Sequence, residues 1–108
     1  MPSPLIVLCR ADDVDEDIPA QASHAGTDYA VFLKDGAFYV TQDLCTHGPG
    51  LMSDGFIEGC EVECSFHQGK FNFITGEATS APCTEPLRIW TACVQDGCVC
   101  IDPDEHRA

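Results

Sequence analysis

Short apolar runs separated by turn dipeptides dominate the pattern of hydrophobic and polar positions along this chain. The runs are rich in Val, Ile, Phe and Tyr, and no stretch sustains a helical period over three turns. β-Branched and aromatic residues favour strands, and dipeptides containing glycine favour tight turns. The pattern therefore predicts an all-β, antiparallel fold built as a small sandwich or barrel.

Two hairpins are predicted together with their register. In each, two apolar runs flank an Asp-Gly dipeptide, which is typical of a two-residue hairpin turn. The first turn pairs Leu33 with Phe38, and the second pairs Cys93 with Cys100. The four predicted strands are Tyr29–Leu33, Ala37–Thr41, Thr91–Gln95 and Cys98–Asp102.

The middle of the chain predicts a series of short hairpins. Turn signals occur at Ser53-Asp54-Gly55, Glu58-Gly59 and Thr75-Gly76. Short strands are expected around Phe56, Glu61–Glu63 and Lys70–Ile74. The acidic run Asp12–Pro19 predicts a solvated loop or a single helical turn. With 108 residues the chain has the size of one domain, residues 1–108.

Charge and hydropathy limit the kinds of partner and the cellular location that we expect for this chain. Eighteen acidic and five basic side chains give a formal net charge of −13. A surface of that sign disfavours nucleic acid and anionic membranes as partners and suits a basic protein. No run approaches the roughly 18 apolar residues of a membrane span, and no secretory signal precedes Cys9. We therefore expect a cytoplasmic protein.

Eight cysteines in so short a chain need an explanation. A disulfide framework would require an oxidising compartment, so metal ligands or small core residues are the better interpretations. Small buried side chains are expected at Cys9, Cys60, Cys83, Cys93, Cys98 and Cys100. His24 and His106 have no partner at metal-ligand spacing and are expected at the surface, whereas Trp90 and the six phenylalanines are expected to fill the core.

Two boxes carry the candidate chemistry. Cys45-Thr46-His47 is followed by Gly48-Pro49-Gly50, and Cys64-Ser65-Phe66-His67 is followed by Gln68-Gly69. Each box offers one thiolate and one imidazole, and the turn signals between them could bring two loop tips face to face. Glycines beside both boxes would let backbone N–H groups approach a buried metal centre closely.

With these boxes the chain resembles the Rieske [2Fe-2S] proteins, and more closely the ferredoxin components of bacterial aromatic-ring-hydroxylating dioxygenase systems of the naphthalene and biphenyl type. The likeness extends to Met52-Ser53-Asp54-Gly55 and to the segment from Thr75-Gly76 to Ala81-Pro82. It implies that Cys45 and Cys64 bind one iron, that His47 and His67 bind the other, and that the Ala81-Pro82 loop covers the cluster. It also implies a cluster-binding region of about residues 44–83 inserted in a β base.

The resemblance also implies a function. The chain would be a monomeric one-electron carrier, not an enzyme, that docks transiently with a flavin-dependent ferredoxin reductase and with a terminal oxygenase. Gly50 and Phe66 stand where Rieske proteins of respiratory complexes have two further cysteines, so the bridging disulfide of that branch would be absent. This favours the lower-potential ferredoxin branch.

Two alternatives remain at the level of the sequence. Two cysteines and two histidines could form a structural zinc site, although zinc sites usually pair like ligands at short spacing and here each box mixes them. The chain could also donate electrons or sense redox state in another assembly, such as one that reduces nitrite. The sequence does not identify an aromatic substrate.

Overall fold

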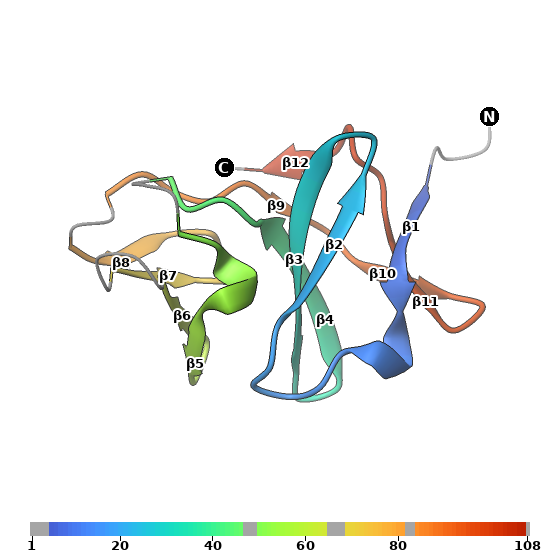
Figure 1. Cartoon of the computed structure of the whole chain (residues 1–108), viewed down its shortest axis with the longest axis horizontal. Helices are drawn as coiled ribbons and strands as arrows, with labels where there is room; N and C mark the ends of the chain where they lie inside the picture. Colours follow the sequence, from blue (N-terminus) through green and yellow to red (C-terminus); the bar gives the residue numbers. More distant parts are fainter. Residues whose placement is uncertain (1–4, 47–49, 65–68, 82–83, 108) are drawn as a thin grey trace.

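The computed structural model describes residues 5–46, 50–64, 69–81 and 84–107. Within these ranges three antiparallel sheets lie in successive layers (Figure 1). One outer layer is a three-stranded sheet of β1 (Ile6–Arg10), β11 (Cys98–Ile101) and β10 (Cys93–Gln95). The all-β, antiparallel prediction is confirmed.

The other two sheets complete the layers. The middle sheet has the order β12 (His106–Arg107), β9 (Ile89–Trp90), β4 (Ala37–Gln42), β3 (Thr27–Lys34) and β2 (Ala20–His24). The four-stranded outer sheet has the order β5 (Phe56–Glu58), β6 (Glu61–Glu63), β7 (Lys70–Asn72) and β8 (Ala78–Ser80). Two short 3-10 turns are η1 (Ala11–Asp13) and η2 (Met52–Asp54).

Both predicted hairpin registers are confirmed. Leu33 lies opposite Phe38 in the β3–β4 hairpin, and Cys93 lies opposite Cys100 in the β10–β11 hairpin. In both turns the aspartate and the glycine have positive φ, as a type I′ turn requires. The right-handed twist of the flanking strands favours this turn type, which is why the local sequence is sufficient to set the register.

The middle sheet separates two hydrophobic cores. Side chains alternate between the faces of a strand, and in β3 Tyr29 and Val31 enter one core while Ala30 and Phe32 enter the other. The first core lies against the three-stranded sheet and includes Val99 and Ile101. The second lies against the four-stranded sheet and includes Val62 and Phe71. The two outer sheets are thus held through opposite faces of one central sheet.

Some expectations about the core are wrong. Phe56 is 70% exposed rather than buried. Pairing places Ile57 opposite Val62, with Ile57 packed against the second core, so the neighbouring positions of this short strand face solvent. Among the six additional cysteines, Cys100 is buried as expected, whereas four are half-buried: Cys9, Cys60, Cys93 and Cys98. Cys83 lies outside the described residues.

Other expectations agree with the model. Phe32, Phe71, Phe73 and Trp90 are buried, and His24 is exposed. The acidic run begins within the single helical turn η1 and continues as a loop. No helix in the described part of the chain is long and apolar enough to cross a membrane.

Candidate cluster site

Both cysteines of the predicted ligand set are buried in the same hydrophobic core. Cys45 is 4% exposed and Cys64 is 0% exposed, and both belong to the cluster that contains Met52, Phe71 and Leu87. Cys64 directly follows β6, and Cys45 follows the central strand β4. Two segments separated by the β5–β6 hairpin therefore bring their thiols into one apolar, water-poor environment.

The two boxes are closed by the same backbone contact. The N–H of Cys45 donates to the carbonyl oxygen of Gly50 at 2.8 Å, and the N–H of Cys64 donates to the carbonyl oxygen of Gly69 at 2.7 Å. In each case a buried cysteine opens the loop, and a buried glycine lies five positions later. Each loop is thus held at its base, and the likeness of the two closures follows from two similar boxes in the sequence.

His47 and His67 lie outside the described residues, so their predicted roles as ligands stay predictions. The described residues contain no group of three Cys, His, Asp or Glu side chains arranged to hold a metal ion. Pro82 of the predicted Ala81-Pro82 covering loop also lies outside the described part of the chain.

A side chain of the first box contacts the segment that follows this covering loop. Thr46 donates from its hydroxyl Oγ1 to the carbonyl oxygen of Glu85 at 2.9 Å. This hydrogen bond spans 39 residues of sequence and fixes the position between the two predicted ligands of the first box. Nothing in the local sequence marks a threonine for a contact so distant in the chain, so this bond is visible only in the folded structure.

Asp43 connects the first box to the middle sheet and to η2. Its side chain is fully buried; Oδ2 accepts from Gln21 Nε2 at 2.6 Å, and Oδ1 accepts from the Ser53 N–H at 2.8 Å. Its backbone carbonyl accepts from the Met52 N–H at 2.6 Å. A residue two positions before Cys45 therefore joins β2, η2 and the start of the loop. Nothing in the local sequence marks this aspartate for such a role.

Replacing Asp43 with alanine is expected to destabilise the fold around the first box. The change leaves the partly buried Ser53 N–H and the Gln21 amide without their acceptor, which costs about 2–3 kcal/mol. Asp43→Asn is the matched control, because it keeps the size of the side chain and one carbonyl oxygen. Thermal unfolding should show a drop in midpoint of roughly 10 °C for alanine and a smaller drop for asparagine. An alanine variant as stable as the parent would contradict this role.

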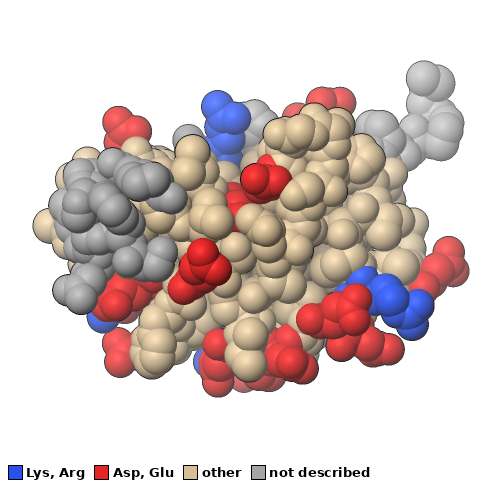
Figure 2. Space-filling view, viewed as in Figure 1, with Lys and Arg blue, Asp and Glu red and all other residues tan. Residues whose placement is uncertain are grey.

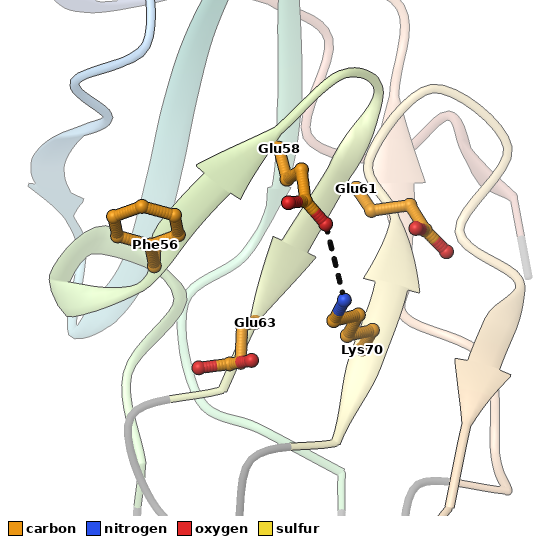
Figure 3. A pocket seen from close by; sticks show the side chains of 5 residues that line it. All are labelled: Phe56, Glu58, Glu61, Glu63 and Lys70. Atoms are coloured by element: carbon orange, nitrogen blue, oxygen red, sulfur yellow. Dashed lines mark hydrogen bonds and ion pairs between the residues drawn. The ribbon is translucent and has the colours of Figure 1, made fainter.

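An acidic face lies on the outer side of the four-stranded sheet, next to the second box. Its side chains line a hollow of about 300 Å³ and are drawn in Figure 3: Phe56, Glu58, Glu61, Glu63 and Lys70. Lys70 Nζ lies 3.3 Å from Glu58 Oε1, and this hydrogen bond together with the carboxylate charge raises the pKa of Lys70. Glu58 lies directly opposite Glu61, an unfavourable pairing of like charges. Three carboxylates and one ammonium make the face negative.

The donors at the two boxes fit a mixed-ligand iron-sulfur cluster. Two buried thiols in one core supply sulfur ligands, and the surrounding apolar side chains exclude water from them. A Rieske centre replaces two of the four cysteines of an ordinary [2Fe-2S] cluster with histidines on one iron. The sequence offers one imidazole in each box for that purpose. The described part of the site is therefore compatible with the predicted ligand set.

Comparison with known proteins supports the same conclusion. The family model for the Rieske [2Fe-2S] domain matches residues 5–91. The ferredoxin component of the p-cumate 2,3-dioxygenase system of Pseudomonas putida is 40% identical over 94% of this chain and 88% of its own length. The biphenyl dioxygenase ferredoxin subunit of Pseudomonas sp. strain KKS102 is 40% identical, with 87% of each chain covered.

A solved structure agrees in fold. It is described as a complex of reduced oxygenase and oxidized ferredoxin in carbazole 1,9a-dioxygenase, and the matching chain has a TM-score of 0.85 and 34% identity. The alignment covers 94% of both chains. From the match of the family model and the similarity of full-length relatives, this chain belongs to the Rieske [2Fe-2S] domain family.

Proposed function

We propose that this chain is the ferredoxin component of an aromatic-ring-hydroxylating dioxygenase system. It carries one electron at a time on a Rieske [2Fe-2S] cluster from a flavin-dependent reductase to a terminal oxygenase, and it catalyses no reaction itself. The observation that carries the proposal is the burial of Cys45 and Cys64 in one core, each at the base of an equivalent loop. Relatives similar over nearly their whole length are themselves named ferredoxin components of such systems.

The proposed ligands are divided between the two boxes. Cys45 and Cys64 bind one iron, and His47 and His67 bind the other. When bound, the cluster supplies a centre that accepts and releases a single electron. The chain's own residues hold the sulfur donors away from water and fix both loop bases through the carbonyls of Gly50 and Gly69.

The proposed cluster-binding region is residues 44–83, inserted in a base formed by the rest of a single domain. The layered arrangement supports this division, because the four-stranded sheet from Phe56 to Ser80 lies within that region. The five-stranded and three-stranded sheets come from segments before and after it. This base would position both loops through β4 and through the buried core that they share.

The proposed partners follow from the task of a shuttle. A protein that exchanges electrons with two others has to leave one before it docks with the next, so we propose transient contacts of a cytoplasmic monomer. Carboxylates are spread over the face drawn in Figure 2, in agreement with the net charge of −13. Such a surface attracts a basic partner over a distance and releases it readily in salt.

Electron paramagnetic resonance tests the proposal. The purified protein should be silent when oxidised and should show, after dithionite reduction, the anisotropic signal of low average g that mixed Cys/His ligation produces. Iron and acid-labile sulfide should be present at two of each per chain. A signal of the four-cysteine type would reassign the ligands, and stoichiometric zinc without sulfide would exclude the electron-transfer function.

Salt should slow electron transfer in the reconstituted system. Raising the ionic strength from about 0.01 M to above about 0.1 M shortens the Debye length from about 30 Å to below about 10 Å, which removes long-range attraction. We expect turnover limited by this protein to fall by about tenfold. Turnover that is indifferent to salt would contradict electrostatic steering.

The acidic face beside the second box should account for part of this effect. Glu61→Gln and Glu63→Gln each remove one charge there and should slow transfer to the oxygenase by about two- to fivefold at low salt. Glu105→Gln makes the same chemical change in an exposed loop between β11 and β12 and serves as the matched control. Equal effects of all three variants would show that the net charge, rather than this face, steers the encounter.

A further inference from the structure

A second group of thiols lies in the three-stranded sheet, away from the cluster site. Cys9 is on β1, Cys93 is on β10, and Cys98 and Cys100 are on β11. Figure 1 shows β10 and β11 at the opposite end of the molecule from β5–β8. No three of the described side chains are arranged as a metal site.

Cys93 and Cys100 are neighbours across the β10–β11 hairpin. They lie directly opposite each other in an antiparallel hairpin, and the side chains of opposite residues project from the same face. The turn at Asp96-Gly97 makes Gln95 and Cys98 the first bonded pair, so Cys93 and Cys100 form the next bonded pair of the ladder. Cα atoms of such pairs are about 5.5 Å apart, within the range of about 4.4–6.8 Å found for disulfides. Their Cβ atoms are up to about 5.5 Å apart, compared with about 3.5–4.5 Å in a disulfide, so forming the bond draws the two strands together by about 1 Å.

The other two cysteines of this sheet lack an opposite thiol. Cys98 lies opposite Gln95 on one side and Arg10 on the other. Cys9 lies opposite Val99. Within the described sheet, Cys93 and Cys100 are therefore the one pair of cysteines that lie directly opposite each other.

The two thiols of this pair differ in accessibility. Cys93 is half-buried, whereas Cys100 is 3% exposed and donates from Sγ to the carbonyl oxygen of Cys98 at 3.7 Å. Burial raises the pKa of Cys100, and the nearby Cys93 and Cys98 add to the rise. Solvent therefore reaches Cys93 first, with Cys100 behind it as the second thiol.

We propose that Cys93 and Cys100 form a site of reversible oxidation by hydrogen peroxide. The sulfur of Cys93 attacks one peroxide oxygen, the O–O bond breaks, and Cys93 becomes a sulfenic acid while one water leaves. The sulfur of Cys100 then attacks the sulfur of Cys93, the S–S bond forms, and the sulfenic oxygen leaves as a second water with the thiol proton. Two thiols have lost two electrons, and one peroxide has become two waters.

This site does not depend on the proposed function, although that function would supply its oxidant. A reduced one-electron carrier that loses its electron to dioxygen forms superoxide, which dismutates to peroxide. Both thiols lie outside residues 44–83, so the bond would leave the proposed cluster ligands unchanged. A dithiol reductant would restore the pair by thiol–disulfide exchange.

Peptide mapping of the intact, cluster-loaded protein tests the site. The protein is treated with a small excess of hydrogen peroxide, quenched in acid, alkylated under denaturing conditions and cleaved at Asp96, which separates Cys93 from Cys98 and Cys100. We expect two fewer alkylated thiols per chain and a cross-linked peptide pair that dithiothreitol separates. The electron paramagnetic resonance signal of the reduced cluster should persist.

Matched variants decide which thiols form the bond. The cross-link should persist in Cys98→Ser and disappear in Cys93→Ser. Cys100→Ser should also abolish it, and if that variant fails to fold because its hydroxyl is buried, the half-buried Cys93→Ser still provides the test. A cross-link that is lost in Cys98→Ser, or oxidation of Cys93 to sulfinic acid without any cross-link, would overturn the proposal.

Discussion

Replacing Cys64 with serine is expected to abolish the Rieske signal and to lower the iron content by at least about tenfold. The thiolate is the metal ligand, and a serine hydroxyl does not replace it at neutral pH. The side chain is also fully buried in a hydrophobic core, so a hydroxyl there would cost more to remove from water than the thiol does. Electron paramagnetic resonance of the reduced protein and an iron assay measure the two effects.

Cys60 provides the matched control for this substitution. It lies four residues earlier, is half-buried and is not part of the proposed ligand set. Cys60→Ser should therefore retain both the iron and the signal. The reverse pattern, with the cluster lost in Cys60→Ser and kept in Cys64→Ser, would reassign the sulfur ligands. His67→Ala should likewise remove the signal, and His24→Ala, at an exposed position on β2, should not.

Replacing Gly76 with alanine is expected to lower the thermal stability by about 10 °C or more. Gly76 has a φ of +84°, and an added Cβ would lie 2.5 Å from the carbonyl oxygen of Leu87. Its carbonyl also accepts the Leu87 N–H at 2.7 Å, so the two segments cannot separate without losing that bond. The left-handed backbone and the clash together lower the free energy of unfolding by about 3 kcal/mol or more. In a domain of this size, such a loss lowers the unfolding midpoint by about 10 °C or more.

Gly36→Ala separates the two contributions to this cost. Gly36 has a similar φ of +81°, but an added Cβ there would meet nothing within 4 Å. This control should cost only about 1 kcal/mol, or roughly 4–8 °C. Loss of the visible cluster absorbance on heating, measured at one scan rate, compares the variants. Equal shifts for both would show that backbone conformation alone accounts for the effect.

The sequence predicts those parts of the fold whose cause is local. Asp-Gly turns set the registers of the two long hairpins because their backbone twist matches the flanking strands. In contrast, β9 and β12 contain two residues each, and their pairing depends on neighbours brought together by the rest of the fold. The predicted burial of Phe56 is wrong because a three-residue strand has almost no pattern that indicates which face is buried.

The candidate site shows the same limit. The two boxes could be recognised because a metal centre requires particular donors at particular spacings, and the structure buries both of their cysteines together. The residues that support the first box, Asp43 and Thr46, act through hydrogen bonds to distant segments. Such contacts exist only in the folded chain, so no local signal marks them.

The alternation of β3 between two cores has a consequence for how this chain can change length. A single inserted or deleted residue near the start of Thr27–Lys34 would turn every later side chain of the strand to the opposite face of the sheet. Phe32 would then point into the core that contains Val31, and Val31 into the core that contains Phe32. The hairpin tips at residues 25–26 and 35–36 are exposed turns, so a change of length there does not alter which core each strand residue faces. Length variation among functional descendants of this sequence should therefore accumulate at those tips, and β3 should evolve by substitution alone.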